Sequence, residues 1–538
     1  MENSAAKSSS HPPPSDPHHA IAVKSVLSLI AAVLSPLALP AASVPRPPAP
    51  PNIVFILADD LGYGDVRCYN PVSKVPTPNI DRLAREGLRF TDAHSPSTVC
   101  TPSRYSLLTG QMAFRIHYRS VFEGVGGPCL IKEDQRTLPQ MLRQQGYATA
   151  LTGKWHVGLS FLDHAGQRIT QGGIAGAKRI DYSRAIPDAP IHRGFDRFFG
   201  TACCPATDSL YAYIDGDRIP VPPTQMLDKS KLPKHPYAFD NRPGLIAPDF
   251  NLEEVDLVFL QKSREFLEQH VQRHPGKPFF LLHSTHAVHL PSFAAKPFQG
   301  STTAGPHGDF IHELDFIVGE LLQTLERLGL ADNTVVMFSS DNGPETTSVA
   351  RMRADYDHDG ARPWRGVKRD QWEGGHRVPF LVRWPGKIAA GRTTDQTVCL
   401  TDVLATCAAI TGAALPADAA EDSFNLLPVL LGTDRGAPVR PYTLHQTISL
   451  ALALRQGPWK YLDHRGSGGN NYAKGELQSW ALPDTAPEAP GQLYRLDTDP
   501  RETTNLYFQH PEKVQELKAL LDASRAAGRS RSLLQPAP

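Results

Sequence analysis

The chain has 538 residues, enough for more than one domain and a large core. Lys and Arg together number 55, as do Asp and Glu, so the formal net charge is zero and the charge balance favours neither nucleic acid nor an anionic membrane surface as a partner. The apolar share of 41% is ordinary for a globular protein, and 49 prolines with 41 glycines indicate many loops.

The N-terminal segment predicts an export signal. Lys24 precedes an apolar run over residues 26–39, and small residues follow at 41–43, which is the order of a secretory signal. The run is too short for a stable membrane span. We therefore expect a signal with a polar extension over residues 1–43, a proline-rich linker over 44–51, and export to the periplasm or the extracellular space. An uncleaved, disordered tail is the alternative.

Polar residues follow two predicted strands in the first part of the chain. The continuous apolar run over residues 52–58 is typical of a strand buried on both faces of a parallel sheet, and it ends at Asp59 and Asp60. A second strand over 147–152 runs into Lys154 and His156. Between the two strands, we expect short helices over residues 79–87 and 138–145.

Residues 99–110 predict a helix that begins near Cys100. Pro102 suits the first turn of a helix, and Gly110 closes the segment. The Cys100 thiol would then lie at a helix N-terminus, where unpaired N–H groups and the helix dipole favour an anion. Taken alone, a buried structural cysteine is the simpler interpretation.

The middle of the chain repeats the strand-and-polar-end pattern. Residues 160–250 are loop-rich and contain no periodic element. A strand over 279–283 leads to His289, and a strand over 334–339 leads to Asp341 and Asn342. The remaining elements are helices over residues 252–270, 310–328 and 402–410, a strand over 378–383, and a loop over 344–378 that carries Lys368.

From about residue 440 the pattern changes to short strands separated by turns. Strands over 451–454, 460–462 and 492–496 predict an antiparallel sheet, and residues 511–527 predict a terminal helix. The fold class is therefore α/β: a large mixed, mostly parallel sheet sandwiched by helices, with a smaller C-terminal α+β part. We expect domain boundaries at 52–435 and 436–538.

Four strand ends carry reactive side chains, which capping alone does not readily explain. Because the carboxyl ends of parallel strands meet at one edge of a sheet, these side chains are expected to converge there. Three aspartates and an asparagine offer only oxygen, which favours Ca²⁺ or Mg²⁺ over Zn²⁺. The converging residues are Asp59, Asp60, Lys154, His156, His289, Asp341 and Asn342.

Several motifs resemble those of the type I sulfatases, in the alkaline phosphatase superfamily. The central one is Cys100-Thr-Pro-Ser-Arg104, followed by Leu-Leu-Thr-Gly. The resemblance runs from about Asn52 to Asn505, and no core motif departs from the family pattern. The other motifs, in family order, are Asp59-Asp60-Leu-Gly-Tyr-Gly-Asp, Gly-Lys154-Trp-His156, His289-Leu-Pro, Ser-Asp341-Asn342-Gly and Gly-Val-Lys368.

The resemblance implies a sulfuric ester hydrolase whose catalytic domain spans residues 52–435. By similarity, a maturation enzyme oxidises Cys100 to formylglycine, and one Ca²⁺ is held by Asp59, Asp60, Asp341, Asn342 and residue 100. Arg104 would orient the nucleophile, while Lys154 and Lys368 would bind sulfate oxygens. His289, with Lys368, would protonate the leaving alcohol, and His156 would accept the proton of the nucleophile. The substrate would be a sulfated carbohydrate or an aryl sulfate.

Two other functions remain open at this stage. Relatives with this signature include phosphonate monoester and phosphodiester hydrolases, and a non-catalytic glycan-binding relative is a third possibility. Six cysteines besides Cys100 remain, and their pairing cannot be deduced. We expect Cys203 and Cys204 to be structural, and no motif selects His283, His286 or His312 for chemistry.

Overall fold

The computed structural model describes residues 49–532. The expected signal over 1–43 and the first part of the linker lie outside these residues. Within them, no helix combines the length and the apolar character needed to cross a membrane.

The centre of the structure is a nine-stranded sheet with the order β13-β2-β12-β11-β1-β10-β4-β5-β7. Strands β11, β1, β10, β4 and β5 are parallel neighbours, whereas β12 and β7 pair antiparallel with theirs. The predicted mixed, mostly parallel sheet is thus confirmed. The strands are β1 (Asn52–Ala58), β2 (Leu88–Phe90), β4 (Ala148–Lys154), β5 (Arg197–Thr201), β7 (Ile214–Asp215), β10 (Phe279–Ser284), β11 (Thr334–Ser340), β12 (Phe380–Arg383) and β13 (Arg392–Thr394).

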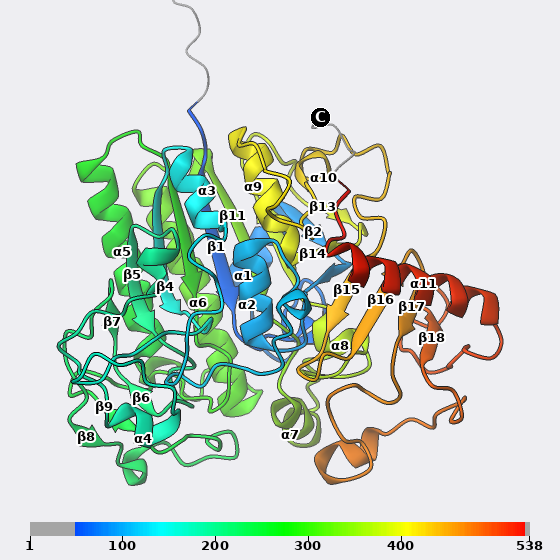
Figure 1. Cartoon of the computed structure of the whole chain (residues 1–538), viewed down its shortest axis with the longest axis horizontal. Coiled ribbons are helices and arrows are strands. Elements are labelled where there is room, and N and C mark those ends of the chain that lie inside the picture. The colour runs from blue at the N-terminus through cyan, green and yellow to red at the C-terminus, as the bar shows by residue number, and fades with distance from the viewer. Residues whose placement is uncertain (1–48, 533–538) are drawn as a thin grey trace, which may run out of the picture. The chain divides into compact units, whose positions relative to one another are not determined.

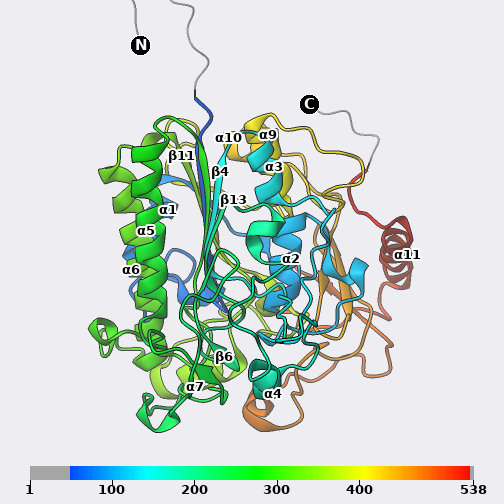
Figure 2. The same ribbon diagram turned by 60° about the vertical axis from the view of Figure 1, so that its left-hand side comes forward.

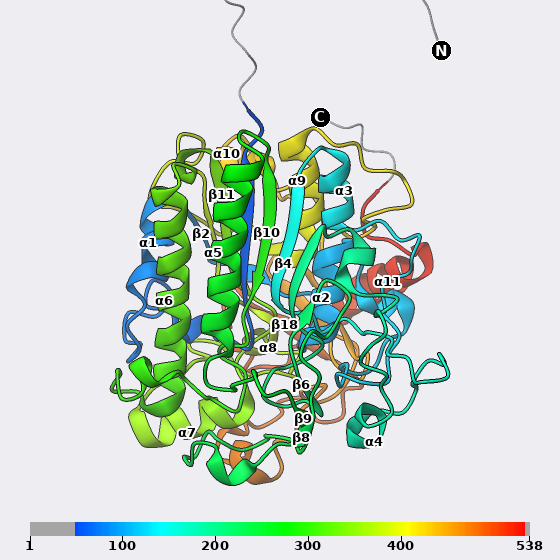
Figure 3. The ribbon, with the colours of Figure 1, turned by 90° about the vertical axis from the view of Figure 1, so that its left-hand side faces the viewer.

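Helices cover both faces of this sheet (Figure 2). Residues of β1 alternate between two hydrophobic clusters. Phe55 packs with the cluster that contains Tyr105 of α2 (Cys100–Thr109), and Ile56 packs with the cluster that contains Leu314 of α6 (Gly305–Arg327). Burial on both faces explains why β1 is continuously apolar. One layer holds α1 (Pro78–Glu86), α5 (Val255–Arg273) and α6 (Gly305–Arg327), the last two side by side in Figure 3; the other holds α2 (Cys100–Thr109), α3 (Leu138–Gln144) and α9 (Val403–Thr411).

The C-terminal part forms a four-stranded antiparallel sheet with α11 (Pro511–Ala527) packed on it (Figure 1). Its strands are β15 (Thr443–Gln446), β16 (Leu452–Gln456), β17 (Trp459–Leu462) and β18 (Gln492–Arg495). Three of them were predicted, whereas β15 was not. The backbone of β15 continues into the segment before α2: the Thr98 N–H donates to the Gln446 carbonyl at 3.0 Å, and the Gln446 N–H to the Pro96 carbonyl at 3.2 Å. The boundary expected at 435/436 stays a prediction.

The loop-rich region over 160–250 holds more regular structure than its sequence indicated. Besides β5 and β7 it contains α4 (Gly173–Ala177) and a small sheet of β6 (Leu210–Tyr211), β8 (Gln225–Met226) and β9 (Leu245–Ile246). Elements of two to five residues are too short for a hydrophobic period to reveal. The helices predicted over 252–270 and 310–328 are observed within a few residues of their expected ends as α5 and α6, although α6 begins five residues earlier than expected. The loop expected over 344–378 is wrong in part, since it contains α7 (Thr346–Tyr356) and the short α8 (Glu373–His376).

Buried neutral histidines in this core make stability depend on pH. His283, in β10, is fully buried with its Nδ1 2.8 Å from Ser263 Oγ, and burial lowers its pKa to about 3. The folded chain therefore stays neutral at His283 while the unfolded chain takes up a proton below about pH 6.5. Stability is full above that pH and is lost as the pH falls, by up to about 1.4 kcal/mol per pH unit for this residue.

We expect the free energy of unfolding of His283→Asn to depend less steeply on pH than that of the unchanged chain. Between pH 6 and pH 4, unfolding of the variant should take up about one proton fewer, which makes the slope smaller by about 1.4 kcal/mol per pH unit. Denaturant titrations at several pH values measure this slope. His164→Asn is the matched control, since the His164 side chain is 82% exposed. Equal slopes for the His283 variant and the unchanged chain would refute the argument.

Candidate functional site

The carboxyl ends of β1 and β11 bring four oxygen-bearing side chains together. The two strands pair in parallel with Ala58 opposite Ser340, so the residues that follow each strand become neighbours. The Asp60 N–H donates to Asp341 Oδ1 at 3.3 Å, and Asn342 Nδ2 donates to Asp60 Oδ1 at 2.7 Å. Asp60 adopts a left-handed backbone with φ of 62°, a conformation that aspartate and asparagine tolerate better than most residues.

Cys100 is the first residue of α2, as the sequence predicted, and it is buried. Arg104, one helical turn after Cys100, connects this helix to the strand ends through hydrogen bonds. Its Nε donates to Asp341 Oδ2 at 2.8 Å, and its Nη1 donates to Ser284 Oγ at 2.6 Å and to the Lys154 carbonyl at 3.2 Å. The nucleophile candidate is therefore fixed relative to the carboxylates.

Two buried lysines neutralise the carboxylates. Lys154 forms an ion pair with Asp59, and Lys368 Nζ lies 2.7 Å from Asp60 Oδ2. Burial opposes the charge on both lysines, but the facing carboxylates outweigh it and raise the pKa of each ammonium. Burial and the neighbouring Asp59 raise the pKa of Asp341 to about 6, against the effect of Arg104. The ammonium groups of Lys154 and Lys368 are therefore both charged at neutral pH.

Two histidines face the same space with opposite protonation. His156 Nε2 is 2.7 Å from the Phe122 carbonyl, and burial with the nearby Lys154 lowers the pKa of His156. Burial also disfavours the charged form of His289, but Cys204 and the carboxylates of Asp60 and Asp59 outweigh it and raise the pKa of His289 to about 9. A neutral base candidate and a protonated acid candidate thus share one cavity.

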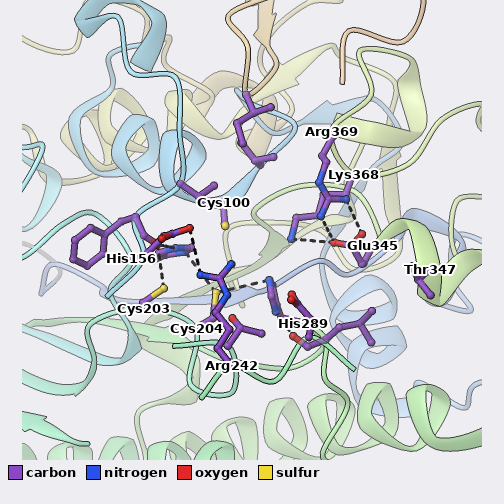
Figure 4. Close-up of a pocket in the computed structure, with 18 of the residues that line it drawn as sticks. Cys100, His156, Cys203, Cys204, Arg242, His289, Glu345, Thr347, Lys368 and Arg369 are labelled. Atoms are coloured by element: carbon purple, nitrogen blue, oxygen red, sulfur yellow. Dashed lines mark hydrogen bonds and ion pairs between the residues drawn. The ribbon is translucent and has the colours of Figure 1, made fainter. Parts of the chain in front are cut away.

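The cavity has a volume of about 360 Å³, and the Cys100 thiol points into it (Figure 4). Its wall includes residues that the sequence analysis did not select for the site: Cys203, Cys204, Arg242, Glu345 and Arg369. The Cys204 Sγ lies 3.7 Å from His289 Nε2 and 3.9 Å from His156 Nδ1. Cys203 and Cys204 follow β5 at the same sheet edge, so recognising β5 as a strand would have placed them here.

Two oxygens without hydrogen-bond partners indicate that this set of side chains fits a cation. Asp59 Oδ1 and Asn342 Oδ1 are buried with no hydrogen-bond partner among the described residues, a costly state unless another ligand is present. Ligand atoms of Asp59, Cys100 and Asp341 lie within 4.8 Å of one another, as do those of Asp59, Asp60 and His289. Since most of these donors are carboxylate or amide oxygens, the group fits a hard divalent cation.

All ten residues predicted for the site therefore lie in one connected group. Direct contacts link Arg104 with Asp341, Asp59 and Lys154, and link Asp60 with Asn342, Lys368 and His289. Cys100, His156, His289 and Lys368 line the same cavity. The group combines a nucleophile candidate, an acid, a base, two cations and a set of hard oxygen ligands, which is suited to hydrolysing an anionic ester.

Comparison with known sequences agrees with this chemistry. The sequence profile of the family described as Sulfatase matches residues 51–413. An N-acetylgalactosamine-6-O-sulfatase of Bacteroides thetaiotaomicron is 33% identical over 496 residues, which cover 88% of this chain and 93% of that protein. Arylsulfatase A of Bos taurus is 34% identical over 513 residues, which cover 90% of each chain.

Solved structures give the same result for the fold. A Bacteroides thetaiotaomicron sulfatase, solved in work on the metabolism of multiple glycosaminoglycans, superposes with a TM-score of 0.74 at 30% identity and covers 89% of this chain and 100% of that one. The PsFucS1 sulfatase from Pseudoalteromonas sp. gives a TM-score of 0.67 at 26% identity, covering 90% and 91%. Each similarity therefore extends over most of this chain.

Proposed function

The chain belongs to the sulfatase family and is a sulfuric ester hydrolase, and we propose that it releases sulfate from a sulfated carbohydrate or an aryl sulfate by means of a formylglycine at position 100 and one bound Ca²⁺. The observation that carries the proposal is the buried group of oxygen donors beside Cys100, with two of those oxygens unpaired. The relatives named for N-acetylgalactosamine 6-sulfate and aryl sulfates support this substrate class.

Conversion of Cys100 to formylglycine by a maturation enzyme would give an aldehyde that hydrates to a diol, so that one hydroxyl takes the sulfate group and the other can expel it. Asp59, Asp60, Asp341 and Asn342 would hold the Ca²⁺ beside position 100. When bound, the cation supplies positive charge that lowers the pKa of the nucleophile and offsets charge on the sulfate. Arg104 keeps α2 in register with those carboxylates through Asp341.

The remaining polar side chains fall into two groups: the lysines bind sulfate, and the histidines transfer protons. Lys154 and Lys368 pair with Asp59 and Asp60. With a cation held by these carboxylates, the two ammonium groups would be available to bind sulfate oxygens. His289, with its raised pKa, donates a proton to the leaving alcohol together with Lys368. His156, with its lowered pKa, accepts the proton of the hydroxyl that expels sulfate.

We further propose that the protein is exported to the periplasm or the extracellular space, in line with the signal expected over residues 1–43. The catalytic part would span residues 52–435 and the C-terminal part 436–538. The maturation enzyme and the sulfated substrate are the partners that this function requires, and neither nucleic acid nor a membrane span has a role in it.

Matched substrates test the reaction type. With 4-nitrophenyl sulfate, a methyl 4-nitrophenyl phosphodiester and a 4-nitrophenyl phosphonate monoester, the leaving group is constant and only the transferred group changes. We expect kcat/KM for the sulfate to exceed the other two by roughly 100-fold or more, about 2.7 kcal/mol of transition-state stabilisation. A preference for either phosphorus ester would establish the alternative hydrolase, and binding of sulfated sugars with no turnover would establish a glycan-binding protein.

Cys204 gives a second test, since it adds a thiol to the cavity wall besides that of Cys100. Burial opposes ionisation of this thiol, but hydrogen bonds from Cys100 and Cys203, with the positive charges of His289 and Lys154, outweigh it and lower its pKa. In the matured enzyme position 100 no longer carries a thiol, but the hydrogen bond from Cys203 and the charges of His289 and Lys154 remain. We therefore expect iodoacetamide to inactivate the matured enzyme by alkylating Cys204, and a bound sulfate analogue to slow this inactivation.

Cys204→Ser should keep activity in the presence of iodoacetamide, whereas Cys68→Ala, at a half-buried thiol outside the cavity, should be inactivated at the rate of the unchanged enzyme. Peptide mapping of the alkylated protein identifies the modified residue. Inactivation of Cys204→Ser at the unchanged rate would mean that a different group reacts.

A further inference from the structure

The proposed mechanism uses the cavity lining around Cys100 and gives no role to a second set of lining residues. We call this set the leaving-group wall; it consists of Glu123, Phe239, Asp240 and Arg242. The proposed acid and cations occupy the part of the lining that receives the sulfate group. The organic part of the substrate would therefore lie against the leaving-group wall.

Hydrogen bonds fix the backbone at Glu123 beside the reaction centre. The N–H of the preceding residue, Phe122, donates to Thr101 Oγ1 at 2.9 Å, directly after Cys100 in α2. The Phe122 carbonyl lies 2.7 Å from His156 Nε2. The Glu123 side chain itself is 59% exposed and lines the cavity. Its carboxylate is thus close to the reacting groups and accessible to a ligand.

Arg242 belongs to a distant segment that is also anchored by hydrogen bonds. Its carbonyl accepts from the Tyr211 hydroxyl at 2.6 Å, and the neighbouring Asn241 Nδ2 donates to the Ala206 carbonyl at 2.8 Å. Arg242 Nη1 lies 3.3 Å from Glu123 Oε1, and the Arg242 side chain is 42% exposed. Figure 4 shows this side chain pointing into the cavity.

The guanidinium of Arg242 has unused donors, unlike that of the other arginine in the cavity. Arg369 donates from both terminal nitrogens to Glu345, at 2.6 and 2.8 Å. Arg242 has one ion-pair partner among residues 49–532, Glu123, although a guanidinium carries five N–H donors. Glu123 forms no second ion pair within the same residues. The two side chains therefore offer both donors and acceptors to a ligand in the cavity.

A ring with hydroxyl groups matches this pair better than a ring without them. A leaving group that fills the cavity displaces water from the guanidinium and the carboxylate, which costs free energy unless the ligand replaces those hydrogen bonds. Sugar hydroxyls donate to Glu123 and accept from Arg242, whereas a simple aryl ring does neither. Phe239, an exposed side chain of the same wall, offers an apolar face to the carbon atoms of the ring.

The charges of the leaving-group wall oppose a second anionic group on the substrate. The carboxylates of Glu123 and Asp240 outnumber the single guanidinium of Arg242. Burial disfavours the charged guanidinium, but these two carboxylates outweigh it and raise the pKa of Arg242. A carboxylate or a further sulfate on the leaving group would therefore face net negative charge, and repulsion of this kind excludes competing ligands.

From these contacts we infer that Glu123 and Arg242 are specificity-determining residues that hydrogen-bond the hydroxyl groups of a sugar whose only charge is its sulfate. The inference rests on the proposed function and narrows its substrate class to singly sulfated, otherwise neutral carbohydrates. Neither residue takes part in breaking the ester bond; both bind the leaving group.

The test compares kcat/KM of the matured enzyme for 4-nitrophenyl sulfate and for a panel of neutral methyl hexopyranosides, each with one sulfate. We expect Glu123→Ala and Arg242→Ala each to lower the ratio of the best sugar sulfate to the aryl sulfate by at least about 10-fold, chiefly through KM, because the aryl ring has no hydroxyl groups. The ratio cancels changes that affect both substrates. Glu133→Ala and Arg67→Ala are the matched controls, at exposed residues outside the cavity, and should keep the ratio.

A second comparison uses the unchanged enzyme and so does not depend on the folding of any variant. We expect a second sulfate on the best sugar substrate to lower kcat/KM by at least about 10-fold. Glu123→Gln should narrow this gap, since it removes the negative charge and keeps an acceptor oxygen.

Three results contradict these expectations in different ways. Sulfate release from the aryl sulfate alone, or a sugar-to-aryl ratio that both alanine variants leave unchanged, would overturn the inference while the sulfatase assignment stands. A preference of the unchanged enzyme for the disulfated sugar would overturn it in favour of a polyanionic substrate. Absence of sulfate release from every probe would contradict the proposed function itself, and the inference would fall with it.

Discussion

Cys100→Ala will give a folded chain that releases no sulfate, and Cys100→Ser will give one that keeps a sulfate group after a single reaction. Alanine has no nucleophile, so we expect kcat/KM to fall by at least about 10³-fold. Serine can accept the sulfate group, but it lacks the second hydroxyl that would expel it. The buried position of Cys100 at the start of α2 is compatible with both small replacements.

Mass spectrometry of the intact protein and of the peptide carrying residue 100 provides the readout. Formylglycine lowers the mass of the unchanged peptide by about 18 Da, and a retained sulfate raises the serine variant by about 80 Da. Cys68→Ala controls for loss of a cysteine elsewhere, since Cys68 is outside the cavity. An active, unmodified thiol at position 100, or a serine variant that turns over at the normal rate, would exclude the mechanism.

Asp60→Asn will remove most of the bound calcium and lower kcat/KM by at least about 100-fold at moderate calcium concentration, because the negative charge of a metal ligand and one of its two oxygens are lost. Asparagine tolerates the left-handed backbone found at Asp60, where φ is 62°, so the substitution adds little backbone strain. Its carbonyl oxygen can still accept the hydrogen bond from Asn342 Nδ2. The expected loss therefore reports on charge.

Atomic emission gives the calcium content, and activity is measured over a calcium titration. We expect high calcium to restore part of the activity of Asp60→Asn. Asp357→Asn is a closely matched control, since Asp357 also has a positive φ, of 50°, while its side chain is 99% exposed. Full calcium retention and normal kcat in Asp60→Asn would show that Asp60 is not a ligand.

Much of the site was predictable because of the parallel sheet. Strands β1, β10 and β11 are buried on both faces, so each appears in the sequence mainly as a run of apolar residues with a polar end, and β4, with two threonines, shows a weaker form of the same pattern. Parallel pairing then forces those ends to one edge, as the register of Ala58 with Ser340 illustrates. Strand direction alone was enough to bring Asp59, Asp60, Asp341 and Asn342 together.

The features that the sequence did not reveal depend on contacts between distant segments. β5 is five residues long and begins with an arginine, so the position of Cys204 at the sheet edge remained hidden. Glu345 reaches the cavity through a bidentate ion pair with Arg369, 24 residues away. Three buried histidines, His94, His376 and His445, also come together from β3 (Ala93–His94), α8 (Glu373–His376) and β15. Neither spacing nor periodicity connects three single histidines in separate elements.

The hydrogen bonds between β15 and residues 96–98 have a consequence for engineering. Because the Gln446 carbonyl accepts from Thr98, two positions before Cys100, the C-terminal sheet helps to hold the backbone that leads into the nucleophile helix. The sheet is thus a poor candidate for exchange as an independent cassette between related enzymes. A chimaera that replaces this sheet must also supply hydrogen-bond partners for residues 96–98, or the first residues of α2 will be displaced.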